Sequence, residues 1–545
     1  MKSTMMDSPL TIARILEHGR QWHAAREVVT EIEHGPRRRA SFAAVAARAA
    51  RLANGLSALG VSGDQRVATY MWNNQEHLEA YLAVPAMGAV LHPVNIRLSP
   101  EQVAYTIDVA EDAVVIVDES LAPDLARLLP DLPTIRAVVV NGTVDRDLFA
   151  RSGCEVVSYE ALIADSGAER TWADVDERDA AILCFTTGTT GNPKGVAYSH
   201  RSIALQSLAS ATANALRIGA EDRILIAVPM FHATAWCYPY SGFWFGADMV
   251  MLDRFLKPES IVGAIEQERV TFANGVPTIW NDVLALLRAE PGHDLSSLRC
   301  IVVGGAAVPR SLMAAFDAEV GVPIFQGWGL TETSPLVAVA RPPAGATPAD
   351  ADAARLSQGR VLAGVEIRIV DPDTLADLPA DGNTIGELEL RGPWVTGSYL
   401  KDDGTDKFHD GWLRTGDIGT LDPSGYVRLT DRTKDVIKSG GEWISSVALE
   451  EALLAHPGIT EAAVIGVPDQ HWGERPCALV VAASGESLEP EAIYAWLQER
   501  VPRWWIPEYW VRVGALPRTS VGKLDKKLLR SRHTVGELDV IVVGK

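Results

Sequence analysis

The chain has 545 residues, a formal net charge of −20, 47% hydrophobic residues and 22% charged residues. This balance is typical of a globular chain with three or four compact units, and it excludes disorder, collagen and coiled coil. The acidic charge argues against nonspecific nucleic-acid binding, which needs a cationic surface to displace counterions. Five scattered cysteines form no metal-ligand spacing, so we expect neither a zinc site nor a disulfide framework.

Helical and strand patterns alternate along the first 360 residues. Ser41 is expected to cap a helix that ends near Gly60, because apolar residues recur every three or four positions between them. Short β-branched runs at 114–117, 138–140 and 301–303 predict strands buried on both faces. Their alternation with helical stretches predicts layered α/β subdomains with largely parallel sheets.

The composition changes after about residue 360, where Gly, Asp and Pro become frequent. Strands predicted at 365–370 and 386–390 indicate a small β-rich subdomain. Beyond Asp431 the pattern becomes compact α+β, so we divide the chain into a domain of residues 1–430 and a smaller, mobile one of residues 431–545. The most apolar long stretch, 224–252, is interrupted by proline, histidine and aspartate, which argues against a membrane span and for a cytoplasmic protein.

The sharpest local motif is Thr-Thr-Gly-Thr-Thr-Gly-Asn-Pro-Lys-Gly at residues 186–195, directly after an apolar run. Its glycines let successive backbone N–H groups face one ligand, its threonines add hydroxyls, and Lys194 adds a positive charge. Such a loop is suited to holding a polyphosphate. It is not a Walker A loop, because Lys194 precedes a glycine rather than following one.

The loop resembles the signature of the adenylate-forming superfamily, which includes acyl-CoA synthetases, luciferases and peptide-synthetase adenylation domains. Six further segments resemble the superfamily's motifs in the same order, at 228–236, 304–307, 326–332, 412–417, 431–442 and 517–523. The segment Lys-Ser-Gly-Gly-Glu-Trp-Ile-Ser at 438–445 looks closest to medium- and long-chain fatty acyl-CoA ligases. The resemblance implies an AMP-forming ligase that uses ATP, Mg²⁺ and CoA. A carboxylate first forms an acyl-adenylate, and a thiol then displaces AMP.

The resemblance also assigns roles to residues. It implies nucleotide binding by Thr186, Thr187, Gly188, Thr189, Thr190, Gly191, Lys194, Gly305, Ala306, Ala307, Gln326, Gly327, Trp328, Gly329, Thr331, Asp417 and Arg432. It implies catalytic roles for Lys523, Lys438, Thr331 and Glu332, with Glu332 also holding Mg²⁺. The thioester step would use the CoA-binding segment Lys438, Ser439, Gly440, Gly441, Glu442 and Trp443, after rotation about a hinge at Asp431.

The acid pocket is implied to contain His232, Trp236, Phe243, Trp244, Gly305 and Gly329. The aromatic residues at 243–245 are larger than in similar medium-chain ligases, so they either shorten the pocket, form flat walls for a ring system, or are core packing. Gln326 also departs from the histidine expected in its motif. The acid is therefore a medium- or long-chain fatty acid, or a bulky hydrophobic acid.

Three other interpretations stay open at this point. The acyl group passes to the phosphopantetheine thiol of a carrier protein rather than to CoA; the scaffold serves a luciferase-like oxygenase; or the protein only binds ligands. The four retained residues Lys438, Lys523, Glu332 and Asp417 argue against the last. Resemblance to bacterial relatives also implies a homodimer.

Overall fold

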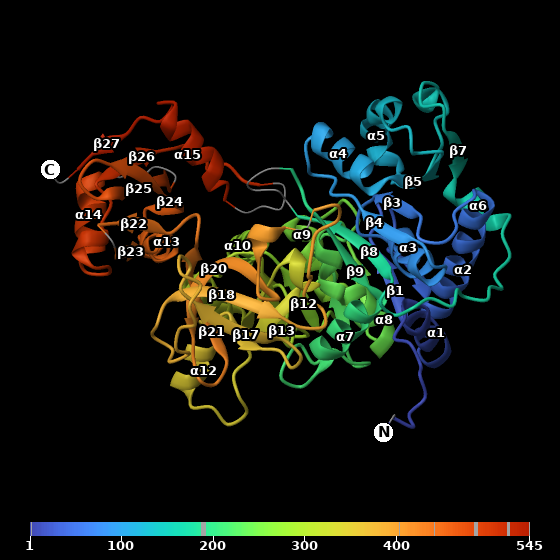
Figure 1. Cartoon of the computed structure of the whole chain (residues 1–545), viewed down its shortest axis with the longest axis horizontal. Coiled ribbons are helices and arrows are strands. Elements are labelled where there is room, and N and C mark those ends of the chain that lie inside the picture. The colour runs from blue at the N-terminus through green and yellow to red at the C-terminus, as the bar shows by residue number, and fades with distance from the viewer. Residues whose placement is uncertain are drawn as a thin grey trace.

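The computed structural model describes residues 1, 3–186, 192–402, 404–440, 442–483, 489–519 and 524–543, apart from the side chain of Glu442. The described chain contains three β-sheets covered by helices (Figure 1). Mixed α/β architecture with a large N-terminal part and a smaller C-terminal part confirms the predicted fold class.

The first sheet has the strand order β7-β6-β5-β3-β4-β8-β9, parallel except for the β8–β9 pair. Its strands are β3 (Arg66–Tyr70), β4 (Val90–Pro93), β5 (Asp112–Asp118), β6 (Ala137–Asn141), β7 (Glu155–Ser158), β8 (Ala180–Phe185) and β9 (Gly195–Ser199). Its helices are α2 (Phe42–Ala58), α3 (Gln75–Ala86), α4 (Pro100–Ala110), α5 (Ala122–Leu128) and α6 (Tyr159–Ala164). The predicted helix after Ser41 is confirmed as α2, because Ser41 Oγ accepts a hydrogen bond from the backbone N–H of Ala44.

The second sheet has fourteen strands in the order β17-β18-β20-β21-β16-β15-β14-β13-β12-β10-β11-β1-β2, with β19 beside β20. Its first strands are β1 (Glu27–Thr30), β2 (Arg38–Ser41), β10 (Arg223–Leu225), β11 (Asp248–Met251), β12 (Phe272–Gly275), β13 (Cys300–Gly304) and β14 (Ile324–Gly329). The later ones are β15 (Leu336–Val339), β16 (Gly359–Val361), β17 (Glu366–Val370), β18 (Gly386–Arg391), β19 (Phe408–His409), β20 (Trp412–Leu421) and β21 (Tyr426–Arg432). The predicted β-rich segment therefore extends this sheet rather than forming a sheet of its own.

Helices separate and cover the two sheets. Those belonging with the second sheet are α1 (Ile12–Trp22), α7 (His200–Ala211), α8 (Tyr238–Phe245), α9 (Pro258–Glu268), α10 (Pro277–Ala289), α11 (Arg310–Ala315) and α12 (Pro348–Arg355). One apolar core joins residues of α1, α2, α3, α7 and α8 to strands of both sheets, so these helices form a layer between the sheets. Two further cores pack α4 and α5 on the outer face of the first sheet, and α9, α10 and α11 on that of the second. The large part is thus layered α/β.

The third sheet lies in the C-terminal part, at the left of Figure 1, and begins after Arg432. Its strands are β22 (Ile437–Ser439), β23 (Glu442–Ile444), β24 (Ile459–Asp469), β25 (Gly473–Ala482), β26 (Tyr509–Arg512) and β27 (Ile541–Val542). Its helices are α13 (Ser446–Leu454), α14 (Pro490–Gln498) and α15 (Lys526–Thr534). The chain leaves the large sheet at the end of β21 and enters this one at β22, so the part that follows has its own core.

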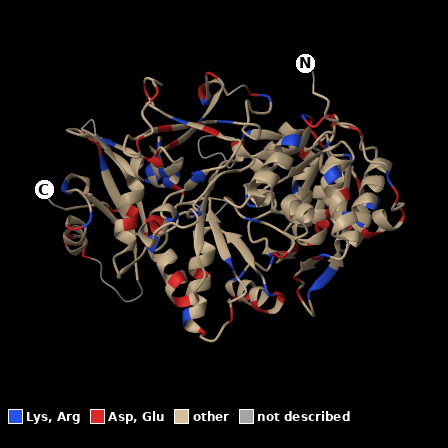
Figure 2. Cartoon of the chain, turned by 90° about the horizontal axis from the view of Figure 1, so that it is seen from below, with Lys and Arg blue, Asp and Glu red and all other residues tan. Residues whose placement is uncertain are grey.

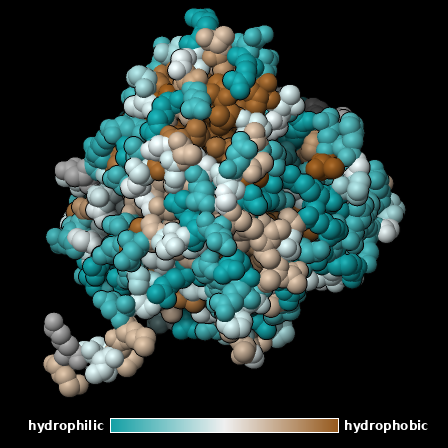
Figure 3. All heavy atoms as spheres, turned by 90° about the vertical axis from the view of Figure 1, so that its right-hand side faces the viewer, coloured by the Kyte–Doolittle hydropathy of each residue, from teal (hydrophilic) through white to brown (hydrophobic). Residues whose placement is uncertain are grey.

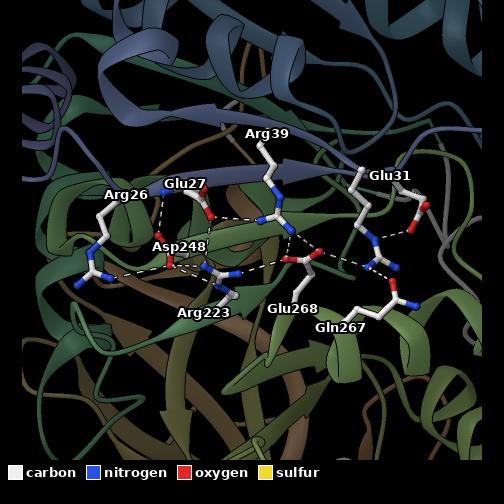
Figure 4. A network of polar contacts seen from close by, with 9 residues as sticks. Arg26, Glu27, Glu31, Arg39, Arg223, Asp248, Gln267 and Glu268 are labelled. Carbon is white, nitrogen blue, oxygen red and sulfur yellow. Dashed lines mark hydrogen bonds and ion pairs between the residues drawn. The ribbon is translucent and has the colours of Figure 1, made fainter. Parts of the chain in front are cut away.

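A network of charged side chains lies at the amino ends of the parallel strands of the large sheet (Figure 4). Arg223 and Asp248 are the first residues of β10 and β11, and their side chains meet at 2.9 Å. Glu268 of α9 is almost fully buried and pairs with Arg39 of β2 at 2.7 Å. Burying a carboxylate needs such partners, so the network closes this end of the sheet. The opposite, carboxyl ends are left for ligands.

The surface carries both signs of charge. Blue and red segments are interspersed along the chain in Figure 2, and no single basic face is visible in that view. Figure 3 shows the side of the molecule on which α2 and α6 lie, and this side is mostly hydrophilic apart from one hydrophobic cluster near its top. Among the described residues, no helix combines the length and the apolar character needed to cross a membrane. All five cysteines are free thiols.

Asp118, at the end of β5, is expected to make stability depend on pH. Burial raises the pKa of Asp118 to about 7, although its carboxylate accepts hydrogen bonds from Trp72 N, Asn141 Nδ2 and Asn74 Nδ2. Because the unfolded pKa is about 3.9, the folded protein keeps a proton that the unfolded chain releases between these values. The free energy of unfolding should therefore fall by a few kcal/mol, on the order of 1.4 per pKa unit, between pH 4 and 7.

Urea unfolding from pH 4 to 8 checks this expectation. Asp118→Asn cannot titrate, so the pH slope of its unfolding free energy should be shallower than that of the wild type. The slope from buried acids that do not interact with Asp118 is common to both proteins and cancels in the difference. Parallel slopes would show that Asp118 is ionised throughout this range.

Candidate active site

A cavity of about 840 Å³ lies at the carboxyl ends of the central strands of the large sheet. Five residues at these strand ends line the cavity. Val228 follows β10, Val276 follows β12, Gly305 follows β13, and Gly327 and Gly329 are among the last three residues of β14. Parallel strands place these turns side by side, which is the usual position for a ligand site in an open α/β sheet. Segments far apart in sequence therefore share one pocket.

The loop of residues 186–195, here called the Gly/Thr loop, meets the cavity at its two ends. The backbone N–H of Thr186 donates to Lys194 O at 2.9 Å, and the N–H of Lys194 donates to Thr186 Oγ1 at 3.0 Å, so the ends are held together. Thr187, Gly188, Thr189, Thr190 and Gly191 lie outside the described residues. Lys194 lines the cavity, where its Nζ is 2.8 Å from Asp402 and 4.8 Å from the centre of the Tyr399 ring. The loop thus presents a fixed positive charge.

Glu332 and Thr331 both line the cavity, just after β14. The Tyr399 hydroxyl donates a hydrogen bond of 2.8 Å to Glu332 Oε1. Burial and the neighbouring Glu332 carboxylate raise the pKa of Tyr399, so its phenol stays protonated and keeps donating. The backbone oxygen of Thr331 accepts a hydrogen bond from Tyr198 on β9, which fixes the turn to the first sheet.

These residues fit a Mg²⁺ ion bound together with phosphate groups. Mg²⁺ favours one or two protein carboxylates and completes its shell with phosphate oxygens and water. Glu332 offers one carboxylate inside a cavity, and no cluster of three or more His, Cys, Asp or Glu residues exists among the described residues to form a cage made only of protein ligands. When bound, the ion would neutralise phosphate charge.

Asp417 lies behind the cavity wall rather than in it. Its Oδ2 accepts a hydrogen bond of 2.8 Å from Trp328 Nε1, and its Oδ1 is 3.1 Å from Arg432 Nε. Trp328 and Arg432 line the cavity, and Asp417 is almost fully buried beneath them. The carboxylate therefore holds both side chains in place at the cavity wall.

The predicted nucleotide-binding residues Gly305, Ala306, Ala307 and Gln326 lie in different environments. Gly305 lines the cavity, whereas Ala306 and Ala307 follow it as exposed residues of the same turn. Gln326 is buried and does not line the cavity, since its amide nitrogen donates to the backbone oxygens of Arg355 and Ser357. Gln326 thus ties β14 to the segment after α12.

His232 and Trp236, two of the residues predicted to bind the acid, line the cavity. Five consecutive residues, 233–237, have positive φ angles of 42° to 61°, a left-handed turn that non-glycine residues rarely adopt. The turn directs the Trp236 ring against β13, where an atom of the ring lies 3.1 Å from the position that a Cβ on Gly304 would take. The backbone oxygen of Gly327 lies closer still, 2.7 Å from that position, so a side chain at 304 would meet both; Trp236 itself lines the cavity.

Phe243 and Trp244 lie elsewhere. Both are on α8, and Phe243 is fully buried and stacks on Phe42 of α2 with ring centres 4.3 Å apart. Trp244 stacks on Phe245, and neither of these residues lines the cavity. Of the sequence alternatives, core packing describes Phe243, and of the aromatic residues predicted to bind the acid only Trp236 lines the cavity.

The predicted CoA-binding segment lies in the C-terminal part, outside the cavity lining. Lys438 Nζ is 3.7 Å from Asp373, Ser439 Oγ accepts a hydrogen bond from Arg475, and Gly440 N donates to Trp472 O. Trp443 is half-buried on β23. Gly441, the Glu442 side chain and the predicted catalytic Lys523 lie outside what the structure describes.

Asp431 joins the two parts of the chain. It is the second-last residue of β21, and its Oδ2 accepts two hydrogen bonds of 2.6 Å, from the backbone N–H and the hydroxyl of Ser446. Ser446 begins α13, so this carboxylate fixes the first helix of the C-terminal part to the last strand of the large sheet.

Several cavity residues were not predicted from the sequence. They are Arg97, Tyr105, Asn192, Tyr399, Asp402, Lys407 and Lys434. Tyr399 and Asp402 lie in a loop that is far in sequence from both Lys194 and Glu332. No local spacing therefore indicates that these residues are in contact. Arg97 lies between β4 and α4, and Tyr105 lies on α4; this segment contains none of the predicted motifs.

The sequence profile of AMP-binding enzymes matches residues 16–400, and the profile of the AMP-binding enzyme C-terminal domain matches residues 448–523. The chain belongs to the AMP-binding enzyme family. This confirms the predicted membership of the adenylate-forming superfamily.

Full-length relatives are CoA ligases. The chain is 42% identical over 536 residues to the 3-methylmercaptopropionyl-CoA ligase of Ruegeria pomeroyi, covering 98% of this chain and 99% of the relative. It is 40% identical to the medium-chain-fatty-acid–CoA ligase of Ectopseudomonas oleovorans, with 98% of each chain covered. The crystal structure of the anthranilate CoA ligase AuaEII bound to anthranoyl-AMP superposes with a TM-score of 0.87 at 26% identity, covering 98% of this chain and 100% of the other.

These findings confirm the predicted activity class. The enzyme is an ATP-dependent acyl-CoA ligase, an acid–thiol ligase that uses ATP, Mg²⁺ and CoA.

Proposed function

We propose that this ligase activates an apolar monocarboxylic acid of short to medium length. The observation that carries this proposal is the Trp236 ring, which lies against Gly304 and takes up space in the cavity near His232. The remaining walls there are apolar side chains such as Val228, Val276 and Ile279. Because the same cavity of about 840 Å³ must also take the nucleotide, little length is left for the acid. Long-chain and polycyclic acids are therefore disfavoured.

In the first half-reaction the acid's carboxylate attacks the α-phosphate of ATP, the bond from the α-phosphorus to the bridging oxygen breaks, and pyrophosphate leaves. Lys194 and Arg432 place two positive charges in the cavity, where they would stabilise charge developing on phosphate oxygens. Glu332 would hold Mg²⁺, and Asp417 would orient Arg432 and accept hydrogen bonds from the ribose. By resemblance, Lys523 bridges the attacking carboxylate and the α-phosphate. No general base is required, since the nucleophile is already an anion.

In the second half-reaction the residues 431–545 would act as a lid that turns about Asp431. What supports this is the 3.7 Å contact between Lys438 Nζ and Asp373, a residue of the loop between β17 and β18. In this position Lys438 does not line the cavity. A change of lid position would be needed to bring the 438–443 segment to the acyl-adenylate.

A carrier-protein acceptor in place of CoA is supported by no contact of the described chain. A homodimer stays a proposal, and light scattering would test it.

The test is acid-dependent pyrophosphate release over a series of straight-chain acids, with Trp236→Ala compared with the wild type. Removing the ring should move the preferred acid to longer chains. Each methylene that enters the new space contributes about 0.8 kcal/mol, so acids a few carbons longer should gain about tenfold or more in kcat/KM.

Trp244→Ala is the matched control, because it removes the same side chain outside the cavity. It should leave the chain-length profile unchanged. A shift in the Trp244 variant with none in the Trp236 variant would contradict the proposed pocket, and a preference of the wild type for long-chain acids would contradict the proposed acid.

A further inference from the structure

A buried lysine lies beside Asp431, and neither half-reaction as described above uses it. Lys526 is the first residue of α15, and its side chain is only 11% exposed. Its Nζ is 2.7 Å from Glu450 Oε1 and donates a hydrogen bond of 2.7 Å to Ser446 Oγ. Both partners belong to α13, so this one ammonium group joins α15 to α13.

The Ser446 hydroxyl connects the lysine to Asp431. It accepts from Lys526 and donates to Asp431 Oδ2 at 2.6 Å, so a continuous chain of hydrogen bonds runs from α15 to the last strand of the large sheet. Burial lowers the pKa of Lys526, but the charges of Glu450 and Asp431 more than offset this effect and raise it. The ammonium therefore stays charged, and it is the partner that these buried carboxylates need.

An ion pair at the next turn of α15 strengthens the attachment. Arg530 lies four residues after Lys526, which places both side chains on one face of the helix. Its Nη1 is 2.8 Å from Asp435 Oδ1, in the short connection between β21 and β22. Thus α15 is fixed to α13 by Lys526 and to the chain just after Asp431 by Arg530.

The position of α15 matters because Lys523 precedes Lys526 by only three residues. Three residues span at most about 11 Å, so the attachment of α15 limits where Lys523 can lie. The chain on either side of Lys523 is also held together, since the backbone N–H of Asp525 donates to Pro517 O at 2.9 Å. A rotation about Asp431 would therefore turn α13, α15 and the segment with Lys523 together, as long as Lys526 joins the two helices.

We propose that Lys526 is a positioning residue that couples the hinge at Asp431 to the segment that carries Lys523. Through Ser446 and Glu450 it makes α13 and α15 move as one body, so that Lys523 reaches the acid and ATP in a fixed position. This inference rests on the proposed hinge and on the proposed adenylation role of Lys523, and it goes beyond both by naming the residue that connects them. Lys526 does not line the cavity and acts only through other residues.

The experiment measures the two half-reactions of Lys526→Met and the wild type separately. With acid and ATP, kcat for pyrophosphate release should fall about tenfold or more, because a small misplacement of a reacting group is costly. The KM values for acid and ATP should stay close to those of the wild type. With supplied acyl-adenylate and CoA, thioester formation should change little, because Arg475 and Trp472 hold the 438–443 segment. Lys526→Arg keeps the charge and should recover part of the adenylation rate.

Lys527→Met is the matched control. Lys527 is the next residue of α15 and is exposed, so its substitution should alter neither half-reaction. The double variant Lys526→Met/Glu450→Gln separates positioning from folding. It removes the carboxylate that Lys526→Met leaves buried without its cation, and the glutamine oxygen can still accept from Val464 N. Its melting temperature should recover relative to Lys526→Met, while its adenylation rate should stay low.

Three outcomes would overturn the proposal. Unchanged pyrophosphate release in Lys526→Met would show that no coupling is needed. Equal losses in both half-reactions, or adenylation that recovers with the melting temperature in the double variant, would assign Lys526 a role in folding alone. If the wild type releases no pyrophosphate with any acid, the proposed function fails, but backbone hydrogen exchange still tests the coupling. Exchange in both α13 and α15 should then be faster in Lys526→Met than in Lys527→Met, and equal exchange would refute it.

Discussion

Replacing Glu332 by glutamine is expected to reduce acid-dependent pyrophosphate release by about 100- to 1,000-fold, as for removal of one preorganised electrostatic group. Glutamine has the same shape, and its amide oxygen can still accept the hydrogen bond from Tyr399, which donates to Glu332 Oε1 at 2.8 Å. What the variant lacks is the negative charge that would hold Mg²⁺ against the phosphates. The measurement is the rate of pyrophosphate release as Mg²⁺ is titrated, and the variant should need a much higher Mg²⁺ concentration.

Tyr399→Phe is the control for this substitution. It removes the hydroxyl that orients Glu332 but leaves the carboxylate, so the loss should be smaller than in Glu332→Gln and the Mg²⁺ dependence should stay close to that of the wild type. An unchanged Mg²⁺ dependence in Glu332→Gln would show that the ion is held elsewhere. Thermal melting of both variants separates lost binding from lost folding.

Asp417→Asn should raise the KM for ATP by about tenfold to 100-fold, since hydrogen bonds to a charged group contribute about 1.5–3 kcal/mol each. Two contacts change at once. The ribose would lose a charged acceptor, and Arg432, 3.1 Å from Asp417 Oδ1, would lose the charge that fixes it in the cavity wall. The rate at saturating ATP should fall less than kcat/KM, because the reacting carboxylate and phosphate do not touch Asp417.

The ribose contact is isolated by measuring the affinity for an ATP analogue that lacks both ribose hydroxyls. Wild type and Asp417→Asn should bind this analogue almost equally well if Asp417 mainly accepts from the ribose. If the variant remains weaker with the analogue, the carboxylate acts through Arg432 and Trp328, with which it already makes contacts of 3.1 Å and 2.8 Å.

Much of the site could be predicted because its chemistry depends on contiguous motifs. A phosphate loop needs glycines and a lysine at short spacing, so residues 186–195 indicate it without a structure. Glu332 is the one acid of its motif, and helix caps such as Ser41 depend on neighbouring residues alone. The α/β class follows from the same local information, since short β-branched runs alternate with helical periods.

The parts that escaped prediction depend on contacts between distant segments. Trp236 and Phe243 are seven residues apart and both aromatic, but the left-handed turn at 233–237 directs Trp236 into the cavity and α8 directs Phe243 into the helical layer. Arg97 meets Phe231 only because the first sheet packs against the second. The β-rich segment joins the large sheet because β16 pairs with β15 and β21. Composition and spacing carry no record of such pairings, since packing and long-range hydrogen bonds select them only once the whole chain is folded.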